Sequence, residues 1–149
     1  GRGTAFRRTP QESMSALLLD TGVLVAMLDR DDPHHAAALG ILSKAAGPFV
    51  IPSTVLPEVC YLAQKYLGPA AEQAFVSSIA QEELPVDWAG PEDLSRAAEI
   101  LRGRPDLGFV DAMVIAAAEK LKIRRIATLD RRHFGNFKPR HCPAFELVP

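Results

Sequence analysis

The chain has 149 residues and a formal net charge of −1; 48% of its residues are hydrophobic and 23% are charged. This length allows one domain with one real core, and this composition excludes a wholly disordered chain. No apolar run reaches the roughly 18 residues of a transmembrane helix, and the N-terminus lacks the pattern of a signal peptide. Its cysteines, Cys60 and Cys142, have no metal-ligand spacing. We therefore expect a soluble cytoplasmic protein without a disulfide framework or a zinc site.

The first thirteen residues, GRGTAFRRTPQES, lack apolar periodicity and precede Met14, which would make a natural start. We interpret residues 1–13 as a leader, either a cloning remnant or a disordered arm. Residues 14–149 are expected to form a single domain, because they contain neither an internal repeat nor a convincing linker.

Short apolar runs then alternate with helical patterns along the chain, which is typical of an α/β domain with a mostly parallel sheet. The apolar runs predict strands near residues 16–19, 48–52, 84–87, 125–128 and 144–148. The helical patterns fall near residues 21–28, 33–46, 54–67, 69–82, 91–103 and 109–122.

Some of these helices have recognisable start signals. Asp32 before Pro33 predicts an N-cap with proline at the first helical position, and residues 90–93 give a similar start with acidic side chains. Pro57 predicts that its helix starts late or kinks, because a proline beyond the first turn removes a backbone hydrogen bond.

Four carboxylates stand where apolar segments meet polar ones. Asp20 ends the run in ALLLD, Glu58 interrupts VLPEVCYLA, Asp111 is the only charge in GFVDAMVIAAA, and Asp130 ends RRIATLD. In a β-α-β unit the helix N-termini lie at the same edge as the strand C-termini, and open α/β sheets bind ligands at that edge. Because two of these acids follow strands and two lie in early helical turns, all four map to one edge.

Each acid also has a purely structural explanation. Asp20 could cap the following helix, Asp111 could complement a helix dipole, Asp130 could initiate a turn, and Glu58 could be a solvated rim residue. Four carboxylates at one edge would, however, repel one another and raise their pKa values. A divalent cation relieves that repulsion, and ligands that are all oxygen favour Mg²⁺ or Mn²⁺ over zinc or copper.

The four acids and their surroundings resemble the PIN domain, and within it the VapC-type toxin ribonucleases of type II toxin–antitoxin pairs. The resemblance runs from about Ala16 to Val148 and rests on LLLDTGVLVAML, LPEVCYL and GFVDAMVIAAAEKLKIRRIATLDRRHF. It implies a three-layer α/β/α sandwich with a central, mostly parallel five-stranded sheet. The acids that would correspond to the family's acidic quartet are Asp20, Glu58, Asp111 and Asp130. Thr128 matches the hydroxyl residue two positions before the last acid.

The resemblance further implies a Mg²⁺- or Mn²⁺-dependent endoribonuclease that hydrolyses RNA phosphodiesters. We expect Asp20 and Asp111 to be the most direct metal ligands, and Glu58 and Asp130 to complete the site directly or through water. Thr128 would support these ligands without binding the metal itself. A cognate VapB-type antitoxin would inhibit the enzyme, with a helix placed on the apolar helices near residues 54–82. A homodimer is also implied.

A basic run in the last third of the chain offers contacts for a polyanion. It consists of Lys120, Lys122, Arg124, Arg125, Arg131, Arg132, Lys138 and Arg140, interrupted by one acid. Phosphate contacts from such residues would make binding dependent on salt, although a solvated face is the alternative. We favour Arg131 and Arg132 as RNA contacts, because they adjoin Asp130. His133 could touch phosphate, but packing or capping is the stronger expectation.

Two other functions fit the same residues. One is a PIN-domain RNA-processing nuclease without a toxin role, and the other is a non-catalytic RNA-binding domain. A response-regulator receiver is disfavoured, because the first strand lacks an acidic pair. A haloacid-dehalogenase-like phosphatase is disfavoured because Gly22 stands where a second aspartate is needed.

Overall fold

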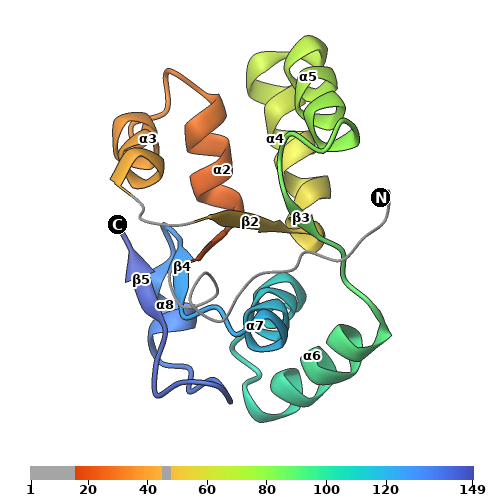
Figure 1. Ribbon diagram of the computed structural model, residues 1–149, viewed down its shortest axis with the longest axis vertical. Coiled ribbons are helices and arrows are strands. Elements are labelled where there is room, and N and C mark those ends of the chain that lie inside the picture. The colour runs from red at the N-terminus through yellow and green to blue at the C-terminus, as the bar shows by residue number, and fades with distance from the viewer. Residues whose placement is uncertain (1–15, 45–47) are drawn as a thin grey trace.

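The computed structural model describes residues 16–44 and 48–149, and their strands form one five-stranded sheet (Figure 1). The strands are β1 (Leu17–Leu19), β2 (Phe49–Pro52), β3 (Val86–Asp87), β4 (Arg125–Ala127) and β5 (Glu146–Val148). Their order is β3-β2-β1-β4-β5, and every neighbouring pair is parallel. The five predicted strands are therefore confirmed. The leader proposed for residues 1–13 lies outside the described residues.

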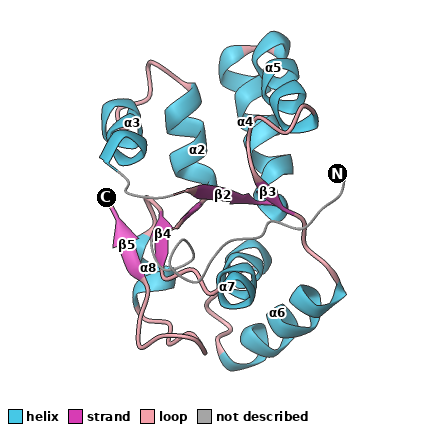
Figure 2. Ribbon diagram, viewed as in Figure 1, coloured by secondary structure: helices cyan, strands magenta, loops and turns pink. Residues whose placement is uncertain are grey.

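Helices cover both faces of the sheet (Figure 2). Those on one side are α2 (Thr21–Leu28), α3 (His35–Lys44), α4 (Leu56–Leu67) and α5 (Pro69–Ala80). Two further helices, α6 (Pro91–Gly103) and α7 (Phe109–Leu121), lie on the other side. A 3-10 turn, η1 (Ser53–Val55), precedes α4, and the short helix α8 (Arg131–Gly135) follows β4. This is the three-layer α/β/α arrangement that the sequence predicted.

The start of α3 differs from the prediction. The helix begins at His35, and Pro33 lies in the preceding turn. The carboxylate of Asp32 accepts a hydrogen bond from the backbone N–H of His34 at 2.8 Å, so Asp32 shapes a turn before the helix and does not cap a helix that starts at Pro33. The late start predicted from Pro57 is seen: α4 begins at Leu56 and not at residue 54, so Pro57 lies in its first turn, where its missing N–H needs no partner.

The hydrophobic core lies against the middle strands and α7. All three residues of β1 are buried, as expected for a parallel strand with helices on both faces. Residues 112–118 of α7 are all buried as well, which explains the nearly continuous apolar sequence of this helix. Asp111 stands at the point where this buried segment reaches the surface.

The strand order places a crevice between β1 and β4. The chain leaves β1 for β2 on one side and later returns to β4 on the other side. Such a switch in direction opens a crevice at the carboxyl ends of the two strands, where open α/β sheets bind ligands. The backbone N–H of Asp20 donates to the carbonyl of Ala127 at 3.0 Å, so the ends of both strands meet there.

Among the described residues, no helix is both long enough and apolar enough to cross a membrane.

Candidate carboxylate site

A threonine hydroxyl joins the two strand ends at the crevice. Thr128 is 1% exposed, and its Oγ1 donates to Asp20 Oδ2 at 2.9 Å. The same oxygen accepts a hydrogen bond from the backbone N–H of Asp130 at 3.0 Å. Thr128 therefore fixes the Asp20 carboxylate and the backbone of the turn that carries Asp130.

Asp20 experiences the charges of two other predicted site residues. Burial is the main cause that raises the pKa of Asp20 above its usual value. Hydrogen bonds from the Thr21 backbone and the Thr128 hydroxyl oppose this rise, while the negative charges of Asp111 and Glu58 add to it. Asp111 and Glu58 therefore each lie within electrostatic range of Asp20.

His133 lies between the other two aspartates. Its Nδ1 is 3.0 Å from Asp111 Oδ2 and 3.1 Å from Asp130 Oδ2. Asp130 also caps α8, because its Oδ1 accepts a hydrogen bond from the backbone N–H of Arg132 at 3.2 Å. Asp130 therefore has both roles: it shapes the turn into the following segment, and it belongs to the acidic cluster.

The four acids are not equally central. Asp20, Asp111 and Asp130 are partly buried around the crevice, whereas Glu58 is exposed in the first turn of α4. Among the described residues, the link between Glu58 and the other acids is the effect of its charge on Asp20. It therefore lies at the rim of the site.

The donor set suits a hard cation, although the side chains would have to adjust. Carboxylate and hydroxyl oxygens are the ligands that Mg²⁺ and Mn²⁺ prefer. Among the residues that the structure describes, no three His, Cys, Asp or Glu side chains lie close enough together to hold a metal ion as they stand. A cation held by both Asp111 and Asp130 would require the imidazole of His133 to move, and Mg²⁺ can also reach carboxylates through retained waters.

A cavity of about 520 Å³ opens beside this cluster. It is lined by Asp20, Gly22, Leu129, Asp130, Arg131 and Arg132. Both arginines that the sequence analysis favoured as RNA contacts thus border the acids. The side chain of Arg132 is 87% exposed, and the guanidinium of Arg131 donates to the carbonyl of Pro149.

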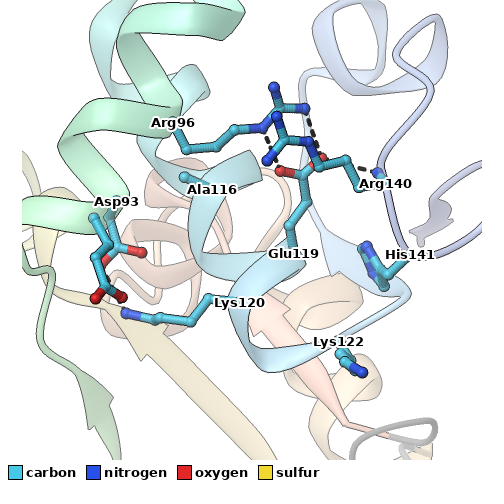
Figure 3. Close-up of a pocket in the computed structure, with 9 residues that line it drawn as sticks. Asp93, Arg96, Ala116, Glu119, Lys120, Lys122, Arg140 and His141 are labelled. Carbon is cyan, nitrogen blue, oxygen red and sulfur yellow. Dashed lines mark hydrogen bonds and ion pairs between the residues drawn. The ribbon is translucent and has the colours of Figure 1, made fainter.

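Three other members of the basic run line a different cavity from these arginines. Lys120, Lys122 and Arg140 line a second cavity of about 460 Å³ between α6, α7 and the loop before β5 (Figure 3). There the Lys120 ammonium lies 2.7 Å from Asp93 and 2.9 Å from Asp87. The expectation of one local basic patch is therefore corrected, since tertiary folding divides the run and pairs part of it with acids.

Two groups of side-chain contacts were not predicted from the sequence. His133 lies three residues after Asp130, a spacing that brings side chains together on a helix and could have indicated the contact. The cluster of Lys120, Asp87 and Asp93 had no comparable signal, because its members come from three different elements.

Comparisons with known proteins agree with this fold. The sequence matches the family model of the PIN domain over residues 17–138. Ribonuclease VapC26 of Mycobacterium tuberculosis is 30% identical over 135 residues, which is 89% of this chain and 100% of that protein.

Two solved structures also resemble the chain. VapC20 of M. tuberculosis, a toxin that cleaves the sarcin–ricin loop, has a TM-score of 0.71 and 21% identity, covering 78% of this chain and 92% of its own. VapBC2 of Rickettsia felis, solved with a DNA fragment from its promoter, has a TM-score of 0.62 and 18% identity, covering 89% and 96%. At these identities the structures establish the fold, and the matches to the family and to VapC26 establish the relationship. The chain belongs to the PIN-domain family.

Proposed function

We propose that this chain is a divalent-metal-dependent endoribonuclease and the toxin of a VapBC-type toxin–antitoxin pair. The observation that carries the proposal is the gathering of Asp20, Asp111 and Asp130 at the switch point of a PIN fold, with Glu58 at the rim. The likeness to a ribonuclease over the whole length of that relative supports the choice of RNA as substrate. The proposal includes a cytoplasmic location, where RNA and an antitoxin would both be found.

The chain's own residues have separate tasks in this proposal. Asp20 and Asp111 would be the most direct ligands of Mg²⁺ or Mn²⁺, with Asp130 and Glu58 completing the site directly or through water. A bound cation would activate water for in-line attack on the phosphodiester and stabilise the departing oxygen. Thr128 holds Asp20 in place through its hydroxyl. Arg131 and Arg132 would hold phosphates on the open side of the cavity.

The experiment that tests this function compares wild-type protein with Asp111→Asn on single-stranded RNA, in Mg²⁺ and in EDTA. We expect cleavage in Mg²⁺, none in EDTA, and a loss of about 100-fold or more in Asp111→Asn, because a ligand carboxylate is replaced by a neutral amide. Asp31→Asn is the matched control, since Asp31 is exposed in the loop between α2 and α3. Cleavage that survives both EDTA and Asp111→Asn would contradict the proposal.

The antitoxin part of the proposal has a surface on α4 and α5. Tyr61, Tyr66 and Val76 are 61%, 60% and 48% exposed, so these helices present large apolar side chains to solvent. An amphipathic antitoxin helix could bury them. Co-expression with a small gene found beside this one should recover a complex of the two proteins. The lack of such a gene, or of a complex, would argue for an RNA-processing nuclease without a toxin role. The homodimer implied by the resemblance stays a prediction.

A further inference from the structure

The cavity beside the carboxylate cluster has uncharged lining residues as well as acidic and basic ones. Of its lining residues, Asp20 and Asp130 are acidic and Arg131 and Arg132 are basic, while Gly22 and Leu129 carry no charge. Leu129 is 38% exposed, so it presents an apolar surface to solvent inside an otherwise charged cavity. The volume of about 520 Å³ falls within the range of about 300 to 1,000 Å³ that is usual for small-molecule sites.

Gly22 lines the cavity beside Leu129 and adds no side chain of its own. It lies in the first turn of α2, where alanine would be the better helix former. A Cβ atom placed on Gly22 would lie 3.5 Å from Cδ1 of Leu129. Any larger side chain at position 22 would therefore project over Leu129 and cover the apolar surface that is now open.

The charged residues that line the cavity around Leu129 suit the binding of one nucleotide. A nucleobase has two flat, weakly polar faces that pack on apolar side chains, and its flanking phosphates need cationic partners. Arg132 can supply such a partner, because its side chain is 87% exposed and therefore accessible to a phosphate. Its Nε is 3.7 Å from Asp130 Oδ1, so the phosphate would be held next to the proposed cleavage site. The two acids that line the same cavity belong to the proposed cleavage site.

We propose that this cavity is a nucleobase subsite, in which the base next to the scissile phosphate rests on Leu129 over Gly22. The proposal rests on the ribonuclease function proposed above and adds the residues that select or accommodate one nucleotide. Leu129 supplies the contact surface and Gly22 supplies the room. The subsite therefore contributes to affinity and to base preference at one position beside the cut.

The test uses the full chain with Leu129→Ala and Gly22→Ala, a fluorescent ten-nucleotide RNA of mixed sequence, and a randomised RNA whose cut sites are mapped. We expect both variants to bind the RNA roughly fivefold more weakly. Leu129→Ala removes the apolar surface on which the base rests, and Gly22→Ala covers part of that surface with a methyl group. We also expect base preference to change at one fixed position beside the cut. Gly22→Ala should keep or raise the Tm, since alanine favours the helix.

The chain offers a matched control for each variant. Leu39→Ala removes a leucine on α3 that is 45% exposed, and Gly40→Ala adds a methyl group to a helical glycine with nothing within 4 Å. Both controls should retain wild-type RNA affinity and base preference. The rise in Tm that Mn²⁺ produces should be the same in all four variants, which would show that the carboxylates are unaffected.

Two results would overturn the subsite. One is RNA affinity and base preference in Leu129→Ala and Gly22→Ala that equal those of the controls. The other is loss of the Mn²⁺-induced rise in Tm, because these residues would then act on the carboxylates and not on a base. Failure of the wild-type chain to cleave RNA would count against the ribonuclease function alone, and the subsite would still be judged by the binding measurement.

Discussion

Asp20 shows how a single residue can be costly to the free protein and useful to a metal site. Its carboxylate is partly buried, and the charges of Asp111 and Glu58 disfavour its ionised form. The Thr128 hydroxyl offsets part of this cost with a hydrogen bond to Asp20 Oδ2 at 2.9 Å. A divalent cation would reverse the balance, because the ionised form would then be the one that is stabilised.

Replacing Asp20 by asparagine therefore has opposite effects with and without metal. The raised pKa means that ionising Asp20 costs stability as pH rises through its folded-state pKa, so Asp20→Asn should melt a few degrees higher than wild type at pH 7 in EDTA. Wild type should gain stability in Mn²⁺, by about 2.7 kcal/mol at 100 times the Kd, and the variant should gain much less. Thermal unfolding in both buffers measures this. A variant that melts lower in EDTA, or that responds fully to Mn²⁺, would contradict the proposed role of Asp20.

At the scale of elements, α7 joins the carboxylate site to a structural ion network. Asp111 lies in its first turn, and Glu119 and Lys120 lie near its end. Glu119 Oε1 is 2.7 Å from Nε of Arg96 on α6, and Glu119 Oε2 accepts a hydrogen bond from the backbone N–H of Arg140 at 2.9 Å (Figure 3). These contacts fix the direction of α7, and with it the position of Asp111.

The Glu119 network should make stability depend on pH. Burial raises the pKa of Glu119, but the hydrogen bonds from Arg96 and Arg140 outweigh it and bring the pKa below the ordinary value of 4.5. The stabilisation is then complete above pH 4.5 and is lost as pH falls through the lower folded-state pKa. Glu119→Gln should cost about 1 to 2 kcal/mol at pH 7, and this difference from wild type should shrink in acid.

Urea unfolding at several pH values measures this difference. Glu99→Gln is the control, because Glu99 pairs with the same two arginines but has a side chain that is 46% exposed, so its loss should cost under about 0.5 kcal/mol. Equal losses in the two variants, or a Glu119→Gln loss that does not change with pH, would show that the network does not stabilise the fold in this way.

Across the whole molecule, folding places the basic side chains in two different surroundings. Lys120 and Arg140 are paired with acids around the second cavity, whereas Arg131 and Arg132 flank the carboxylate site. The net charge of −1 gives no general attraction for a polyanion, so RNA affinity has to come from such local cations. Arg131 and Arg132 line the same cavity as Asp20 and Asp130, so they are the cations that we expect to meet RNA there.

The salt dependence of RNA binding should therefore change with these two arginines alone. Each phosphate contact to single-stranded RNA contributes about 0.7 to the slope of log K against log salt concentration, so Arg131→Ala with Arg132→Ala should reduce the slope by about 1.4. Arg140→Ala should leave it unchanged, because that guanidinium is 3.0 Å from Glu99 in the other cavity. Binding isotherms at several salt concentrations give the slopes. A larger effect from Arg140→Ala would mean that RNA binds across the second cavity.

The sequence by itself determined the five strands, the longer helices and the edge at which the acids lie. Apolar runs such as residues 17–19 and 125–127 specify buried parallel strands, and acids directly after them must emerge at the carboxyl edge. The start of α3 could not be predicted in the same way, because Asp32 can shape a turn or cap a helix with the same local sequence. The short helix α8 was missed because only five residues carry its pattern.

Only the tertiary structure decided which side chains meet at that edge. Thr128 and Asp20 are 108 residues apart, and their hydrogen bond exists because β1 and β4 are neighbours in the sheet. The place of His133 between two aspartates, the exposed position of Glu58 and the approach of Gly22 to Leu129 depend equally on packing between elements. Local periodicity contains no information on such distances, because they arise when separate hydrophobic faces are buried against one another.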